Sequence, residues 1–533
     1  MHSPSGGAGD PTGGGRDDSH GAEHRRTFLG ALKWAFAMNW GQRALGAFFT
    51  FVLAALLGPH DFGVVAIAMI YIALAQVFLE QGFSTALIQR QDLEPDHLHS
   101  AFWLNLVWCL ALAGLTVGVS GWWAELNGAP ELRAVLSVLS LLLVFEGLNI
   151  VQQAYLQRTA DFKKLAVRTN AAALLGGVVG VALALVGAGV WALVAQQLAM
   201  DAIALVLIWI LSPWRPARRF SRRHARDLLG FSFHVFFANL GGFVNRRADA
   251  LLLGVFFGPV VVGIYRLADR FVDLLYDLTT RPVMLISLPL FSRLQQDREH
   301  LRGALETCLR LTLFLTVPAL LVLAACSDFL LAVIGPEWEP GADALKLLAL
   351  AGIGKAVIAF TGPLLFALGR PAFRAVMLWL LGAASAGAVV AVAGFLQSAS
   401  EERQIFGVAL SRAVLFLLVF VPANLLIVEW LTGFRPRAFA AMSAAPAAAG
   451  AAAIVVVFVL REMTAIETIP PVAGLAVAGV LAAATAAGTL FLLDHRAREY
   501  VRGLRRERGL PRPAVRAFGS GDEQIAPVSS DRA

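Results

Sequence analysis

The stretch LAALLGPHDFG, from Leu53 to Gly63, ends one long apolar run and begins the next. A membrane-spanning helix needs about 20 mostly apolar residues, because the hydrocarbon layer is about 30 Å thick and each helical residue rises about 1.5 Å. The two runs, at about 38–57 and 63–86, meet this requirement. The stretch therefore predicts two spanning helices joined by a short turn.

A second copy of this pattern occurs about 200 residues later. The stretch LLGVFFGPVVVG, which starts at Leu252, contains Gly258, Pro259 and Gly263 at the places of the first Gly-Pro pair and the glycine after it. One Gly-Pro pair at a helix end is ordinary punctuation. Two copies, each at the start of a half, predict two related bundles of six helices, and parallel repeats of this kind form transporters whose site lies between the halves.

The composition indicates a membrane protein throughout. Of the 533 residues, 58% are hydrophobic and 15% are charged, against about 45–50% and 25% in soluble domains. Further apolar runs raise the expected number of transmembrane helices to about fourteen. The predicted fold class is an all-α polytopic membrane protein with two pseudo-symmetric six-helix lobes plus two C-terminal helices. The net charge of +7 indicates no nucleic-acid partner, because the basic residues flank the apolar runs.

The gaps between the spans predict the domains and their orientation. Lys and Arg concentrate in alternate gaps on the side of the N terminus, and the opposite gaps contain only Arg133, Arg403 and Arg461. The positive-inside rule therefore places both termini in the cytoplasm. The predicted parts are a disordered N-terminal tail (1–27), an N-terminal lobe (28–211), a basic cytoplasmic linker (212–231), a C-terminal lobe (232–431), two further helices (432–493) and a basic cytoplasmic tail (494–533).

Charged residues inside the expected spans are the main sign of a function. Each costs about 2.5–3.5 kcal/mol at a helix centre, so it should face protein or water rather than lipid. The eighth expected span carries six of them within an arc of about 120°, and the first, second and seventh spans add five. The candidate substrate-binding residues are Arg43, Arg246, Arg247, Arg266, Arg270 and Arg281, and the candidate coupling or gating residues are Glu80, Asp249, Asp269, Asp273 and Asp277.

Two interpretations of the charged stripe compete. In one, the charges neutralise each other at i,i+3 and i,i+4 spacing and only hold the halves together. In the other, they line a hydrated cavity, where arginines bind phosphate and carboxylates carry coupling protons or ions or act as gates. The cavity is favoured, because a structural role would not require an unpaired Arg43 or the net positive segment 246–249. The pairs that the spacing predicts are Arg266 with Asp269, Arg270 with Asp273, and Asp277 with Arg281.

Other features weigh against alternative readings. If residues 264–281 lay flat on the membrane, only ten apolar residues would remain, and ten cannot span. No GxxxxGK[ST] motif occurs, and the three cysteines stand apart, so no cofactor, metal or catalytic residue is expected. The chain is predicted to be a transporter and not an enzyme. An aromatic belt at the membrane edges is expected from Trp122, Trp123, Trp214 and Trp338.

Several stretches resemble a known family. LGPHDFGVVAIAMIYIALAQVFLEQGFSTALIQRQ (Leu57–Gln91) and NRRADALLLGVFFGPVVVGIYRLADRF (Asn245–Phe271) are similar to the openings of the two lobes of polysaccharide and O-antigen flippases. These belong to the multidrug/oligosaccharidyl-lipid/polysaccharide exporter (MOP) superfamily. The match continues in PLFSRLQQD (Pro289–Asp297), IGPEW (Ile334–Trp338) and LLFALGRP (Leu364–Pro371), and covers roughly residues 30–430.

The resemblance implies a multi-pass flippase of the bacterial inner membrane. Such a protein would move undecaprenyl-diphosphate-linked oligosaccharide repeat units outward for lipopolysaccharide or exopolysaccharide assembly, by alternating access through a charged central cavity. Its first, second, seventh and eighth helices would line that cavity. A proton or sodium gradient, and the polymerase and glycosyltransferases of the pathway, are candidate partners. The alternatives are an ion-coupled multidrug exporter of the same superfamily, a flippase of peptidoglycan lipid precursors, and a non-transporting scaffold of a polysaccharide synthase complex.

Overall fold

The computed structural model describes residues 34, 38–80, 94–159, 161–223, 240–244, 247, 249–463 and 470–493. Regular secondary structure in these residues is helical. The predicted tails, 1–27 and 494–533, and the second part of the predicted linker, from 224 onward, lie outside the described residues.

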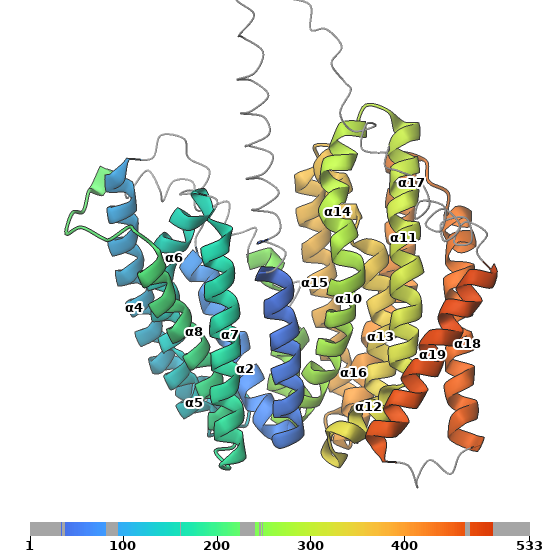
Figure 1. Cartoon of the computed structure of the whole chain (residues 1–533), viewed down its shortest axis with the longest axis horizontal. Coiled ribbons are helices and arrows are strands. Elements are labelled where there is room, and N and C mark those ends of the chain that lie inside the picture. Colours follow the sequence, from blue (N-terminus) through green and yellow to red (C-terminus); the bar gives the residue numbers. More distant parts are fainter. Residues whose placement is uncertain are drawn as a thin grey trace, which may run out of the picture.

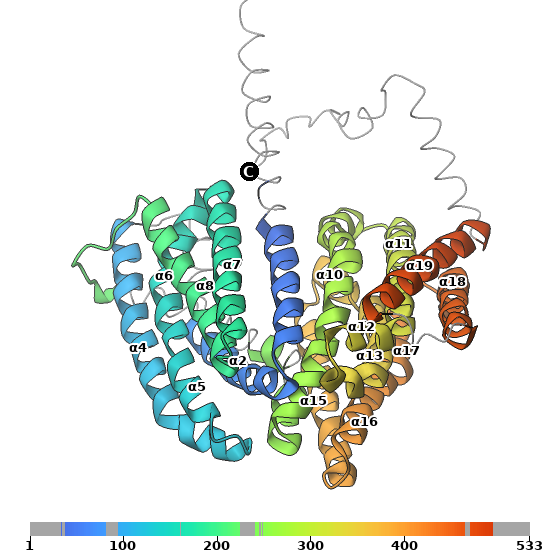
Figure 2. The same ribbon diagram turned by 60° about the horizontal axis from the view of Figure 1, so that its bottom comes forward.

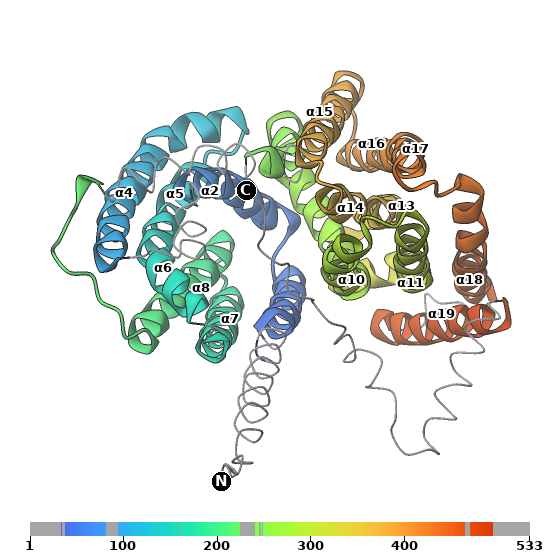
Figure 3. The same cartoon turned by 90° about the horizontal axis from the view of Figure 1, so that it is seen from above.

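Two bundles of helices stand side by side (Figure 1). The N-bundle contains helix 38–56 and the elements up to α8, and the C-bundle contains helix 249–257 and the elements from α10 to α17. Helices α18 and α19 pack together at the outer edge of the C-bundle, which is clearest from above (Figure 3). The N-bundle elements are α2 (Pro59–Glu80), α4 (Pro95–Leu126), α5 (Leu132–Leu139), α6 (Leu141–Arg158), α7 (Phe162–Leu185) and α8 (Val190–Leu211).

The second half of the chain has longer and more broken helices. Helix α10 has 36 residues, with Pro282 and Pro289 in its interior as well as Pro259 in its first turn, and a π-helical segment, η2, interrupts the helical run after α16. The elements are α10 (Pro259–Leu294), α11 (Arg298–Ala325), α12 (Ser327–Ile334), η1 (Pro336–Gly341), α13 (Ala342–Ile358), α14 (Thr361–Ala367), α15 (Pro371–Leu396), α16 (Glu401–Val414), η2 (Leu415–Phe420), α17 (Val421–Thr432), α18 (Pro436–Met463) and α19 (Pro471–Leu493).

Eleven helices of the described residues are long and apolar enough to cross a membrane. They occupy the places of the expected spans two to six and nine to fourteen. Three further helices lie at the remaining places: helix 38–56, helix 249–257 and α10. They are not among the eleven, because the first two are short or partly outside the described residues and α10 carries many charges. The protein is therefore an all-helical polytopic membrane protein, and the total of about fourteen spans stays a prediction.

The two copies of the Gly-Pro turn meet each other. A Cβ atom on Gly63 would lie 1.8 Å from the carbonyl oxygen of Pro259, and a Cβ atom on Gly263 would lie 2.0 Å from that of Pro59. Since real Cβ atoms do not approach other atoms closer than 3.0 Å, only glycine allows α2 and α10 to come this near. We call the end of the molecule that contains both turns the Gly-Pro end; it is the lower end in Figure 1.

Apolar packing surrounds this contact. Buried side chains from both bundles form one core, which includes Val64 and Ile67 of α2, Val261 of α10 and Leu345 of α13. Helix 38–56 stands between α7 and α10 (Figure 2) and packs against α7, where Phe49 lies against Gly177. The bundles are thus joined at the Gly-Pro end by an apolar, buried core.

Trp338 of η1 belongs to this core. Its side chain is 2% exposed, its Nε1–H donates to the carbonyl oxygen of Ala54 at 3.0 Å, and its ring lies edge-on to Phe62 at 5.4 Å. The prediction that Trp338 belongs to an aromatic belt is wrong, because the ring fills the interface between the bundles. Trp122, which is 60% exposed, has the exposure that a belt requires.

Candidate functional site

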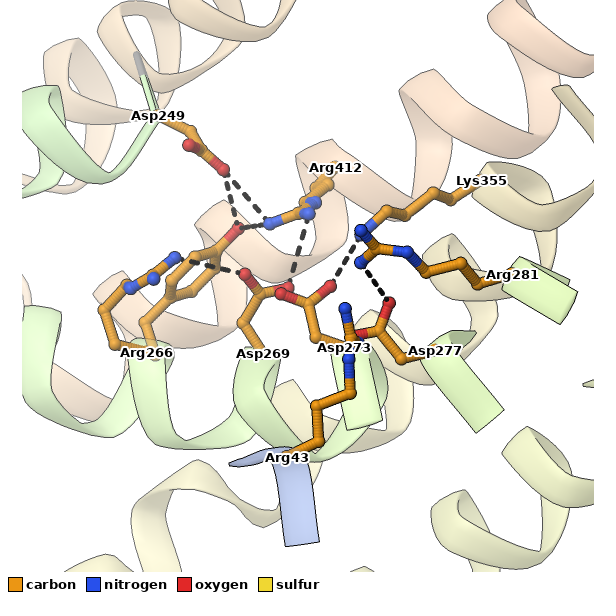
Figure 4. Close-up of polar contacts among 10 residues, drawn as sticks. Arg43, Asp249, Arg266, Asp269, Asp273, Asp277, Arg281, Lys355 and Arg412 are labelled. Atoms are coloured by element: carbon orange, nitrogen blue, oxygen red, sulfur yellow. Dashed lines mark hydrogen bonds and ion pairs between the residues drawn. The ribbon is translucent and has the colours of Figure 1, made fainter. Parts of the chain in front are cut away.

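Helix α10 carries the charged stripe along the interface between the bundles. It follows Gly258, whose φ of +80° favours glycine, and Pro259 occupies the first turn, where a missing N–H leaves no helical bond unmade. Its charged side chains meet Arg43 from helix 38–56, Lys355 from α13 and Arg412 from α16 (Figure 4). The helix is continuous and packs along α2, α11 and α13, so residues 264–281 do not form a separate surface helix.

The first turns of α10 belong to a buried network around Arg412. Its Nη1 donates to Asp249 Oδ2 at 3.0 Å and to the Tyr265 hydroxyl at 2.7 Å. Its Nη2 lies 3.3 Å from Asp269 Oδ1, and Arg266 Nη1 lies 3.3 Å from the other oxygen of the same carboxylate. Asp269 is 5% exposed and Tyr265 is fully buried. Two cations balance two carboxylates, so this network has no net charge with which to attract an anion.

The later turns of α10 carry more accessible ion pairs. Arg43 contacts Asp277, and Arg281 Nη1 donates to the same carboxylate at 3.3 Å. Lys355 Nζ donates to Asp273 Oδ1 at 2.6 Å. The five side chains are 25–47% exposed, so the surrounding protein does not enclose them. The pair between Arg43 and Asp277 also links the two bundles.

Two cavities lie beside this helix. One, of about 290 Å³, lies between helix 38–56 and α10. The other, of about 330 Å³, lies between α10 and four elements of the N-bundle: helix 38–56, α2, α7 and α8. Gln42 and Arg270 line both, and the polar groups around them come from both bundles. The other polar lining residues are Asn39, Arg43, Asp273 and Asp277 in the first cavity and Thr50, Gln196, Gln197 and Arg266 in the second.

Arg270 is the basic residue best placed to bind an anion. It lines both cavities, and it reaches across to helix 38–56, where a Cβ on Gly46 would lie 3.4 Å from its Nη2. Within the described residues, neither Arg270 nor the half-buried Arg247 forms an ion pair or a side-chain hydrogen bond. These two guanidinium groups therefore retain their full donor capacity.

The predicted pairs are partly right. Arg266 pairs with Asp269 and Arg281 pairs with Asp277, as the spacing predicts. The predicted pairing of Arg270 with Asp273 is wrong, because Lys355 occupies that carboxylate. The expectation that Arg43 is unpaired is also wrong, because Asp277 lies opposite it on α10. Arg246 and the side chain of Glu80 lie outside the described part of the chain.

Sequence reasoning missed two cations of the site, Arg412 and Lys355. Each is a single charge in an apolar run, far in sequence from the stripe, and only the folded chain brings them to Asp269 and Asp273. A π-helical segment follows Arg412 by three residues, a feature often found at functional sites. Lys346, another intramembrane cation, pairs instead with Asp328 and Asp343, away from α10.

The described residues contain no group of three His, Cys, Asp or Glu side chains that could hold a metal ion. The arginine and amide side chains that line the two cavities support the binding of an anionic, hydrogen-bonding molecule between the bundles. The excess of basic over acidic side chains and the unpaired Arg270 favour a phosphate-bearing group, since guanidinium binds phosphate oxygens through paired hydrogen bonds.

Comparison with known proteins gives a family. A family model described as polysaccharide biosynthesis protein matches residues 52–343, more than half of the chain. The succinoglycan biosynthesis transport protein ExoT of Rhizobium meliloti is 31% identical over 302 residues, which is 56% of this chain and 61% of ExoT. The teichuronic acid biosynthesis protein TuaB of Bacillus subtilis is 27% identical over 56% of this chain and 62% of TuaB. The lipopolysaccharide biosynthesis protein WzxC of Escherichia coli is 25% identical over 70% of this chain and 78% of WzxC.

The chain thus spans about three fifths of the length of the first two relatives. Among solved structures, the lipid II flippase MurJ in an inward closed conformation superimposes with a TM-score of 0.66, at 17% identity, over 86% of this chain and 99% of MurJ. An inward-facing multidrug resistance transporter of the MATE family superimposes with a TM-score of 0.57, at 14% identity, over 73% of this chain and 96% of the transporter. At these identities the likeness shows the fold alone. The chain therefore belongs to the polysaccharide biosynthesis protein family, and it shares its fold with MurJ and the MATE transporter.

Proposed function

We propose that the protein carries undecaprenyl-diphosphate-linked oligosaccharide repeat units across the bacterial inner membrane for lipopolysaccharide or exopolysaccharide assembly. The cost of burying hydroxyl groups, about 2–7 kcal/mol each without a partner, makes unassisted crossing very slow. A hydrated passage between two bundles removes most of this cost. Polymerase and glycosyltransferases of the same pathway are the partners that this function requires.

One observation carries the proposal: Arg270 lines two cavities between the bundles and forms no ion pair among the described residues. An unpaired guanidinium in a membrane protein is costly, so it should have a ligand or water to bind. Arg247 is a second basic side chain without an ion pair, and Arg43 and Arg281 share one carboxylate, that of Asp277, so this group keeps one net positive charge. A diphosphate at Arg270 would gain several charge-assisted hydrogen bonds.

The orientation follows from the sequence. With both termini in the cytoplasm and about fourteen spans, in two six-helix lobes and two C-terminal helices, the Gly-Pro end faces the periplasm. The apolar core at the Gly-Pro end then closes the periplasmic side of the passage. The ion pair between Arg43 and Asp277 is a gate that must separate as the bundles move. Asp273 pairs with Lys355 but is 42% exposed, so it is more accessible to a coupling ion than Asp249 and Asp269, which Arg412 holds.

The lipid part of the substrate also has a place. A cavity of about 530 Å³ with an almost wholly apolar lining lies between α11 and α19, and Leu275 of α10 forms part of its wall. Leu275 is two residues from both Asp273 and Asp277. A polyprenyl chain could therefore remain in an apolar surrounding while its diphosphate reaches the charged face of the same helix.

The fold does not separate this function from its rivals, since MurJ and the MATE transporter share it. A multidrug exporter of organic cations should have an apolar, aromatic cavity with one or two carboxylates, and the excess of arginine here would repel such cations. A scaffold that transports nothing should tolerate loss of Arg270. A flippase of peptidoglycan precursors needs the same diphosphate contact, so the sugar part must distinguish it.

A flipping assay in proteoliposomes tests the proposal. We expect Arg270→Ala to reduce flipping of a lipid-linked oligosaccharide about 10- to 100-fold, because it removes charge-assisted hydrogen bonds, and Arg270→Lys to keep part of the activity. Arg461→Ala is the control, because Arg461 is 58% exposed, pairs with Asp328 and lines neither cavity in which Arg270 lies. An imposed proton or sodium gradient identifies the coupling ion. Flipping by Arg270→Ala at the wild-type rate would remove the proposed site.

A further inference from the structure

The N-bundle contains a fourth cavity, of about 240 Å³, that the charged stripe does not reach. Helix 38–56, α6, α7 and α8 enclose it. It shares Gln42 and Met200 with the 330 Å³ cavity, so the two lie directly side by side. Its polar lining residues are Gln42, Gln153, Gln157, Arg168, Thr169 and Asp201.

Glutamine dominates the N-bundle side of both cavities. Together they are lined by Gln42, Gln153, Gln157, Gln196 and Gln197. An amide that loses water without gaining a partner costs several kcal/mol, so five amides facing one space in a membrane protein need an explanation. Three of them, Gln42, Gln157 and Gln196, make no side-chain hydrogen bond within the described residues.

The other two amides are held in fixed orientations by charges. Arg168 donates from Nη1 to Gln153 Oε1 at 3.0 Å and from Nε to the carbonyl oxygen of Ala204 at 3.2 Å. Gln197 donates from Nε2 to Asp201 Oδ2 at 3.1 Å. A guanidinium only donates hydrogen bonds, so Arg168 engages the carbonyl oxygen of Gln153 and leaves its NH₂ group for another partner. A carboxylate only accepts them, so Asp201 engages the NH₂ group of Gln197 and leaves its carbonyl oxygen. The charged residues thus determine which amide groups remain available.

The available groups fit a neutral, hydroxyl-rich ligand. Amides offer a donor and an acceptor at a short distance, as a sugar hydroxyl also does. Arg168 and Asp201 bring opposite charges into the same cavity, so the N-bundle wall has no net charge and no preference for an anion. The C-bundle wall, by contrast, presents Arg266 and Arg270.

We propose that the glutamines of the N-bundle bind the sugar part of the substrate, while Arg270 on the opposite wall binds the diphosphate. This inference rests on the proposed function and adds that different residues bind the sugar and the diphosphate. Gln42 lines the cavities of about 240, 290 and 330 Å³, so it lies where the sugar and the diphosphate of the ligand join. Arg168 and Asp201 are positioning residues, because they act through Gln153 and Gln197.

The test compares the affinities of the full-length protein in nanodiscs for two probes. One is undecaprenyl diphosphate, and the other is the undecaprenyl-diphosphate-linked oligosaccharide that accumulates in cells lacking this gene. We expect Gln42→Met and Gln196→Met each to weaken binding of the oligosaccharide lipid about 2- to 10-fold and to leave the affinity for the bare diphosphate unchanged. Neither glutamine has a hydrogen-bond partner to lose within the described chain, so both variants should fold.

Gln152→Met is the matched control. Gln152 follows Leu-rich sequence on the same helix as Gln153, is fully buried, and lines neither cavity, so its replacement should leave both affinities unchanged. Arg270→Ala should weaken both probes equally. If the wild-type protein binds neither probe, the proposed function fails and this inference fails with it. If it binds both, and the glutamine variants keep the wild-type ratio of the two affinities, the sugar site is wrong and the proposed function stands.

Discussion

Replacing Gly63 and Gly263 with alanine should open the Gly-Pro end. The added Cβ atoms would lie 1.8 Å and 2.0 Å from the carbonyl oxygens of Pro259 and Pro59, so the two backbones must separate by more than 1 Å. Overpacking of this kind costs about 1–3 kcal/mol. If the bundles exchange between two arrangements, the closed one loses that free energy relative to the open one, which changes their ratio about 5- to 150-fold.

Electron–electron distance measurements between two spin labels can detect this change. Glu125 at the end of α4 and Glu402 at the start of α16 are exposed positions on different bundles, both near the Gly-Pro end. The native cysteines, Cys109, Cys308 and Cys326, are buried, so background labelling should be low. We expect the alanine variant to populate longer distances between the labels than the wild-type protein.

Gly118→Ala provides the control, because a Cβ at Gly118 of α4 would have no atom within 4 Å. It adds the same methyl group to a spanning helix without touching the other bundle. If the double variant gave the wild-type distance distribution and the wild-type flipping rate, the contact between α2 and α10 would not be what holds the Gly-Pro end closed.

Two further variants test the packing of the interface. Arg412→Met removes the positive charge that pairs with Asp249 and Asp269, so it should destabilise the protein by about 3–5 kcal/mol and lower the midpoint of thermal unfolding in detergent. Adding Asp269→Asn should restore part of the midpoint. An unchanged midpoint for Arg412→Met would mean that water compensates the carboxylates. Trp338→Phe removes the hydrogen bond to Ala54 and should cost about 0.5–1.5 kcal/mol in the same measurement, whereas a wild-type midpoint would show that this bond adds nothing between the bundles.

Much of the fold follows from the sequence, because apolar run length and punctuation are local properties. The runs beside Gly58 and Gly258 predict helices that begin at about residues 63 and 263, and the structure starts α2 and α10 four residues earlier, at Pro59 and Pro259. The contact between the two Gly-Pro turns joins residues about 200 positions apart, so it could not be predicted. The sequence repeat shows only that Gly63 and Gly263 occupy equivalent positions. Spacing also identifies the charged face of α10, since 100° per residue fixes which side chains share a side.

The partners of those charges could not be predicted, because they depend on tertiary packing. Asp273 has Arg270 at helical spacing, yet it pairs with Lys355, 82 residues away. Arg412 gives no local sign that it lies between two carboxylates. Asp201 is likewise a single charge in an apolar run, and its relation to Gln197 becomes visible only when the cavity inside the N-bundle is seen.

The network around Arg412 also restricts how the molecule can move. One guanidinium connects helix 249–257, α10 and α16, and Asp269, its partner on α10, is the immediate neighbour of Arg270 in the chain. A ligand that displaces Arg270 cannot rotate α10 alone without breaking buried ion pairs. The C-bundle should therefore shift as one rigid body, with the change concentrated where α2 meets α10. Binding of the substrate at Arg270 would then be directly coupled to the movement of the whole C-bundle.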